Sequence, residues 1–131
     1  MNDTLFLLPN FIGDFNKSLL PQHTLDTVYS LKHFIVERER TARAFLKAIE
    51  HPIPQDDFVF CELNKHKGYS GYKAFFNEHI DENSIGLLSE AGLPAVADPG
   101  SEVVQYAHTK GVLVKPLAGS SSIFLALMAS G

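Results

Sequence analysis

The sequence predicts an α/β fold, a mainly parallel five-stranded sheet with helices on both faces. Short apolar runs typical of buried strands alternate along the chain with helical stretches that carry one apolar face. Loops rich in glycine and proline follow several of the apolar runs, as expected for connections at strand ends. With 131 residues, of which 45% are hydrophobic, the chain is long enough for one domain with a sizeable core.

The first half of the chain begins this alternation. Residues 4–8 are predicted as a strand, and Thr24 is a candidate N-cap for the short helix that follows. Residues 33–36 are predicted as a second strand. Residues 38–49 place four apolar side chains on one helical face, and the prolines that follow end this helix.

The second half continues the pattern to the last residue. The predicted elements are a strand at 58–63, a helix at 72–79, a buried strand at 84–88, a helix at 101–107 closed by Gly111, a buried strand at 112–114 and a helix at 121–128. The last helix is nearly all apolar, so we expect it to pack against further protein surface. We therefore expect residues 1–131 to form the first domain of a longer protein.

Three loops are candidates for a ligand site. They span residues 9–14, 91–98 and 119–122, and each follows a predicted strand. Because the carboxyl ends of parallel strands meet at one edge of a sheet, we expect the three loops to converge there in a crevice. Gly92 permits close approach of the backbone to a ligand. The alternative is ordinary turn chemistry, with the serines of the third loop serving only as a helix N-cap.

Composition limits the function classes. The formal net charge of −4 and the pI of about 5.8 provide no basic stripe, so RNA contact would need surface from elsewhere. Cys61 is the single cysteine and cannot form an internal disulfide, which fits a reducing cytoplasm. The N-terminal segment lacks the basic region of a signal peptide, and its apolar run is too short to span a bilayer.

Most motifs of the common enzyme classes are absent from the sequence. The six histidines show no metal-ligand spacing, so we predict no metal site and expect each histidine at the surface. A nucleophile elbow, a Walker A loop and a GxGxxG fingerprint are missing. A charged group at Glu37, Arg38, Glu39, Arg40 and Arg43 follows the second strand. It is either a solvated helix start or part of a site at the strand's carboxyl end.

Four segments together resemble one protein family. LFLLPNFIGD is similar to an opening strand and P-x-P-I-G-N loop, and FIVERERTARAFL to I-A-A-E-D-T-R-R-T-R-K-L-L. LLSEAGLPAVADPG is similar to V-S-D-A-G-T-P-x-I-S-D-P-G, and KPLAGSSSIFLALMASG contains a counterpart of P-L-P-G-P-S-A. In this order they resemble the N-terminal domain of the tetrapyrrole (corrin and porphyrin) methylase family. The nearest branch 2'-O-methylates a cytidine of small-subunit ribosomal RNA.

The resemblance implies an S-adenosylmethionine-dependent methyltransferase with ribosomal RNA as substrate, working in the cytoplasm as a homodimer. It implies two domains with the cofactor between them, so this chain alone is expected to be inactive. Glu37 is a candidate general base, with Arg40 and Arg43 available to hold phosphate. The cofactor-binding residues that the resemblance implies are Ile12, Ala91, Gly92, Leu93, Val96, Ser121 and Ser122. A methylase of tetrapyrroles or other small molecules, and a non-catalytic binding module, are the alternatives.

Overall fold

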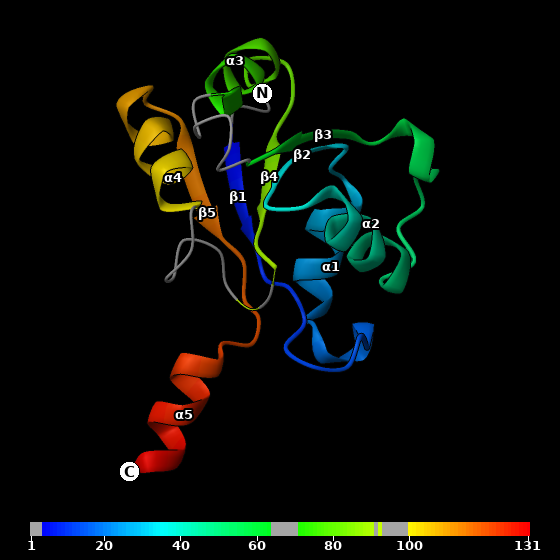
Figure 1. Ribbon diagram of the computed structural model, residues 1–131, viewed down its shortest axis with the longest axis vertical. Helices are drawn as coiled ribbons and strands as arrows, with labels where there is room; N and C mark the ends of the chain where they lie inside the picture. Colours follow the sequence, from blue (N-terminus) through cyan, green and yellow to red (C-terminus); the bar gives the residue numbers. More distant parts are fainter. Residues whose placement is uncertain (1–3, 64–70, 91, 93–99) are drawn as a thin grey trace.

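A parallel sheet forms the centre of the computed structural model, which describes residues 4–63, 71–90, 92 and 100–131 (Figure 1). The five strands lie in the order β3-β2-β4-β1-β5, and every neighbouring pair is parallel. They are β1 (Thr4–Leu8), β2 (His33–Val36), β3 (Val59–Glu62), β4 (Ile85–Leu88) and β5 (Leu113–Pro116). The predicted fold class is confirmed.

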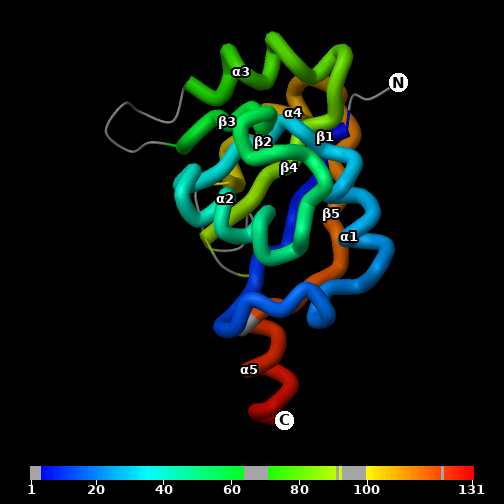
Figure 2. Tube along the Cα trace, turned by 90° about the vertical axis from the view of Figure 1, so that its right-hand side faces the viewer, coloured from blue at the N-terminus to red at the C-terminus, as the bar shows by residue number. Residues whose placement is uncertain are grey.

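Helices cover both faces of the sheet. Those that pack on the sheet are α1 (Gln22–Tyr29), α2 (Glu39–Ala48), α3 (Gly71–His79) and α4 (Gly100–Thr109). The chain also contains α5 (Ser122–Ser130) and the short 3-10 turns η1 (Lys17–Leu19) and η2 (Gln55–Asp57). Figure 1 shows α1 and α2 on one side of the sheet and α3 and α4 on the other, and Figure 2 shows the same layers from the side. Consecutive residues of a strand pack against different helix layers, because their side chains point to opposite faces of the sheet. Phe34 packs in the core with α1 and α2, and Ile35 packs in the core with α3 and α4.

The first helix begins earlier than the sequence predicted. Pro21 precedes α1 with a φ of −58°, a value that suits the start of a helix, and Thr24 lies inside the helix. The prediction of Thr24 as N-cap is therefore wrong. Its buried hydroxyl instead donates to the carbonyl of Ala118 at 2.9 Å and joins α1 to the loop after β5.

The fifth strand is more exposed than predicted. It pairs only with β1, at the edge of the sheet, and the Leu113 side chain is 56% exposed. The sequence predicted a buried strand because an apolar run carries no mark of an edge position. The turn before it is as expected, since Gly111 adopts a left-handed φ of +68° after α4.

One histidine is a half-buried structural residue, contrary to the expected surface position. His51 lies half-buried between α2 and η2. Its Nε2 lies 2.9 Å from the Val28 carbonyl, and its Nδ1 accepts the Ile53 N–H at 3.1 Å. This pair of partners fits the neutral ring with a proton on Nε2. Burial lowers the pKa of His51, while hydrogen bonding to backbone carbonyls acts in the opposite direction.

The last helix extends away from the sheet (Figures 1 and 2). The Ser121 hydroxyl accepts the Phe124 N–H at 3.4 Å, so the predicted serine N-cap is confirmed. Five large apolar side chains of α5 are 50–77% exposed, namely Ile123, Phe124, Leu125, Leu127 and Met128. None of the described helices has the length and hydropathy that crossing a membrane requires.

Candidate functional site

The connections that follow β1 and β4 run to opposite faces of the sheet. These two strands are neighbours, but the chain leaves β1 for α1 on one face and leaves β4 for α4 on the other. In open α/β sheets this divergence opens a crevice at the strand ends, where ligands bind. The candidate site lies at this edge.

The three candidate loops meet there, as predicted. The N–H of Asn10 donates to the carbonyl of Gly92 at 2.7 Å. Gly119 lies against Pro9, so closely that a Cβ on Gly119 would lie 2.1 Å from the proline Cβ. A Cβ on Gly92 would lie 3.7 Å from the carbonyl oxygen of Ser120, which places the second and third loops side by side.

Asn10 holds the first loop to the second. Its side chain is 1% exposed, and its amide nitrogen donates to the carbonyls of Ser89 and Glu90 at 3.0 and 3.1 Å. Its side-chain oxygen accepts the Phe11 N–H at 2.7 Å. Asn10 was not among the residues predicted for the site. The available signal was a polar residue directly after a buried strand, at a position where the backbone must turn.

The backbone conformation at residue 92 favours glycine. Its φ is +69°, which side chains disfavour, and the residue is buried. Its carbonyl accepts the Asn10 N–H and, at 3.4 Å, the Ser89 hydroxyl. The predicted cofactor-binding residues Ala91, Leu93 and Val96 lie outside the described residues.

The other predicted cofactor-binding residues flank this junction. Ile12 is half-buried in the loop after β1, next to Phe11, whose ring centroid lies 5.5 Å from that of Phe45 on α2. Ser121 is 8% exposed and caps α5, and Ser122 is the first residue of that helix. The loops therefore bring Ile12, Gly92 and the start of α5 to the same edge of the sheet.

Glu37 and Glu90 join two strand ends across the edge. Glu37 follows β2, and its Oε2 accepts the Glu90 N–H at 3.2 Å. The Oε2 atom of Glu90 accepts the Thr41 hydroxyl at 2.9 Å. The other oxygen of Glu90, Oε1, is buried and has no hydrogen-bond partner among the residues described. The sequence singled out Glu37 but gave Glu90 no role.

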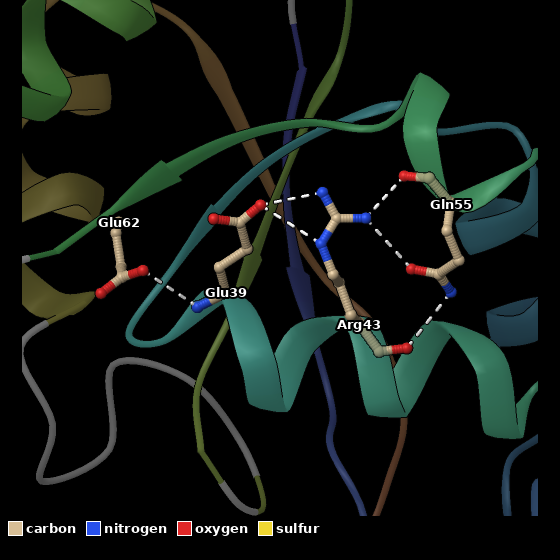
Figure 3. Close-up of polar contacts among 4 residues, drawn as sticks. All are labelled: Glu39, Arg43, Gln55 and Glu62. Carbon is tan, nitrogen blue, oxygen red and sulfur yellow. Dashed lines mark hydrogen bonds and ion pairs between the residues drawn. The ribbon is translucent and has the colours of Figure 1, made fainter.

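Arg43 does not take the role predicted for it (Figure 3). Its guanidinium bonds Glu39 Oε1 at 2.8 and 3.2 Å and the carbonyl of Gln55 at 2.6 Å. It also lies 4.9 Å from the ring centroid of Phe60, a cation–π geometry. These contacts fix α2 to β3 and η2, so the prediction that Arg43 is available for phosphate is wrong. Arg40, on the same helix, is exposed.

Thiol and metal chemistry receive no support in the described part of the chain. Burial raises the pKa of the Cys61 thiol on β3, so the thiol stays protonated near neutral pH. Within residues 4–63, 71–90, 92 and 100–131, no group of three or more His, Cys, Asp or Glu side chains is arranged to hold a metal ion.

These features define the class: an α/β domain in which the chain diverges between the neighbouring parallel strands β1 and β4, the position at which open α/β sheets bind ligands. Nearly the whole chain is similar to proteins named Ribosomal RNA small subunit methyltransferase I. The protein of that name from Halalkalibacterium halodurans is 37% identical over 128 residues, or 98% of this chain. Those from Bacillus subtilis and Vibrio cholerae are 33% and 31% identical over 127 residues each.

The chain is therefore a homologue of small-subunit ribosomal RNA methyltransferases, which confirms the resemblance predicted from the four motifs. It spans 41–42% of the length of these three relatives. No family model matches the chain.

Proposed function

We propose that this chain is the N-terminal domain of an S-adenosylmethionine-dependent methyltransferase that methylates a ribose 2'-oxygen of small-subunit ribosomal RNA. The observation that carries the proposal is similarity over 97–98% of the chain to methyltransferases named for this substrate. The meeting of the loops at the carboxyl ends of β1, β4 and β5 supports a ligand position there, because open α/β sheets bind ligands at such strand ends.

Two features of the described residues support S-adenosylmethionine as the cofactor. Gly92 and Gly119 bring backbone, without side chains, to the junction of the loops. Glu37 and Glu90 bring two carboxyl groups to the same edge, and carboxylates attract the positively charged sulfonium and ammonium groups of S-adenosylmethionine. By resemblance, Ile12, Ala91, Gly92, Leu93, Val96, Ser121 and Ser122 hold this ligand.

The protein's own contribution is orientation. When bound, S-adenosylmethionine supplies a methyl group activated by its sulfonium. Transfer of this methyl group depends more on alignment of the acceptor oxygen than on a strong general base. Holding two reactants in line supplies up to about 7 to 11 kcal/mol in favourable cases. The Asn10 clamp and the capped start of α5 fix the crevice walls for this purpose. Glu37 is the candidate base for the ribose hydroxyl, and Arg40 the candidate phosphate contact.

The proposal includes a second domain and a second copy. Because the chain spans 41–42% of its relatives' length, we propose that a further domain completes the pocket and that residues 1–131 alone bind the cofactor weakly and transfer no methyl group. Calorimetry that finds low-micromolar binding by these residues alone would contradict this point. We also propose that the full-length protein acts in the cytoplasm as a homodimer.

A methyl-transfer assay with the full-length protein tests the function. Purified protein and isotope-labelled S-adenosylmethionine are incubated with unmodified small ribosomal subunits, naked small-subunit RNA and a panel of corrinoids and porphyrins. We expect label in ribosomal RNA alone. Label in a tetrapyrrole would establish the small-molecule alternative, and cofactor binding without transfer to any acceptor would favour the non-catalytic module.

Variants connect this assay to the site. Glu37→Gln and Arg40→Ala are expected to lower the transfer to ribosomal RNA by roughly 10-fold or more, because a general base alone typically contributes about 100-fold or more and phosphate contacts position the RNA. Lys47→Ala is the matched control, because Lys47 is exposed in the last turn of the same helix. Equal activity of all three variants would remove Glu37 and Arg40 from the site.

A further inference from the structure

The protein holds Glu90 at its backbone and at one of its two carboxyl oxygens. Its Oε2 accepts the Thr41 hydroxyl from α2, its N–H donates to Glu37, and its carbonyl accepts the Asn10 side chain. The residue follows Ser89 at the end of β4, next to the junction of the three loops. Three different elements therefore fix both the backbone and one oxygen of the side chain.

The remaining oxygen of this carboxyl group is unusual. Glu90 Oε1 is buried, yet it has no hydrogen-bond partner among the described residues. An ionised carboxylate oxygen is a hydrogen-bond acceptor only, so its missing partner must be a donor. Buried acceptors without a partner are rare in folded proteins, and each one calls for a specific explanation. A ligand that brings a donor into the crevice supplies one.

The proposed reaction brings a suitable donor from either of its two reactants. S-adenosylmethionine contains the ribose of its adenosine, and the RNA acceptor is itself a ribose hydroxyl. A carboxylate at a strand's carboxyl end that accepts a ribose hydroxyl is a recurrent way for α/β folds to bind nucleotides. We propose that Glu90 Oε1 accepts a hydrogen bond from a ribose hydroxyl bound in the crevice. The inference rests on the proposed function and adds a binding residue to it.

Deoxyribose analogues test this inference without any mutation. In the full-length protein, calorimetry compares S-adenosylhomocysteine with its 2'-deoxy and 3'-deoxy forms. If Glu90 binds the ribose of S-adenosylmethionine, one deoxy form of S-adenosylhomocysteine binds roughly 10- to 100-fold more weakly, the usual loss for a hydrogen bond to a charged group. The same deficit should become several-fold smaller in Glu90→Gln, because an uncharged carboxamide oxygen accepts a weaker hydrogen bond than a carboxylate.

The acceptor is the second arm of the experiment. If Glu90 binds the ribose of the RNA, Glu90→Gln keeps its affinity for S-adenosylhomocysteine. Its rate of transfer to small-subunit RNA at saturating donor then falls roughly 10- to 100-fold. Glu62→Gln is the matched control, because Glu62 is an exposed carboxylate at the carboxyl end of β3 that accepts the Glu39 N–H at 3.2 Å. This control should behave like the wild type in both arms.

Two outcomes overturn the inference. Glu90→Gln that folds and stays within about twofold of the wild type in both arms would show that Oε1 meets no ligand. Equal affinity of the wild type for all three S-adenosylhomocysteine forms, together with unchanged transfer by the variant, would do the same. If the wild type binds donor but methylates no RNA, the proposed function fails by itself. The deoxy series then decides about Glu90, and equal affinities overturn its role.

Discussion

The contact between Gly119 and Pro9 gives a sharp test of how the first and third loops are joined. A Cβ on Gly119 would lie 2.1 Å from the Pro9 Cβ and 2.4 Å from its Cγ, whereas carbon atoms in contact stay about 3.5 to 4.0 Å apart. Gly119→Ala must therefore displace one loop by roughly 1.5 Å, because the ring of a buried proline cannot rotate away.

The expected loss of stability follows from two opposing terms. Overpacking of this kind costs about 1 to 3 kcal/mol, and the rigid ring places Gly119→Ala near the upper end. Replacing a glycine also restricts the unfolded chain, which returns about 0.4 to 1 kcal/mol. We expect a net loss of about 2 kcal/mol in the free energy of unfolding, measured by urea titration followed by circular dichroism.

A second glycine provides the control. Gly71 begins α3, and a Cβ there would meet no atom within 4 Å. Gly71→Ala should leave stability unchanged or raise it by up to about 1 kcal/mol through the unfolded chain alone. If the two variants differ by less than about 0.5 kcal/mol, the loops are not packed as described and the reasoning fails.

Three further predictions concern the clamp, the core histidine and the last helix. Asn10→Ala removes three hydrogen bonds of a buried side chain and should cost about 2 to 3 kcal/mol in the same titration; a loss below about 0.5 kcal/mol would contradict the clamp. Because burial lowers the pKa of His51, the unfolded chain takes up the proton first. Stability should therefore be full above about pH 6.5 and fall as the pH drops toward 5, with a weaker fall in His51→Gln; parallel pH profiles would refute this. Finally, the exposed apolar side chains of α5 should make residues 1–131 self-associate, burying roughly 800 Å² or more per partner, and a clean monomer in light scattering at high concentration would oppose this.

The alternation of strands and helices was readable in the sequence because its signals are local. Apolar runs, helical faces and a glycine after α4 each depend on neighbouring residues, and the five strands follow from them. The exposure of β5 was not readable, because an edge position depends on which strands pair, and that is decided across the whole chain. Thr24 shows the same limit, since its hydroxyl bonds a carbonyl 94 residues away.

The site was predicted by position more than by side chain. The convergence of the loops follows from parallel strands, so Ile12, Gly92 and Ser121 were placed correctly at one edge. Asn10 and Glu90 were missed because most of their contacts join residues 49 to 80 positions apart, and no spacing in the sequence marks such pairs. The i to i+4 spacing of Glu39 and Arg43 suits their ion pair, whereas no spacing in the sequence marks the contacts of Arg43 with Gln55.

The central claim is that the protein containing this chain methylates ribose in small-subunit ribosomal RNA. Mass spectrometry of that RNA, taken from cells with and without the gene, tests the claim most directly. We expect one nucleotide to be lighter by a single methyl group in the deletion strain. The wild-type gene should restore this methyl group, and a gene with Glu37→Gln should restore it in a smaller fraction of the RNA. Small-subunit RNA with an identical set of methylated nucleotides in both strains would contradict the account.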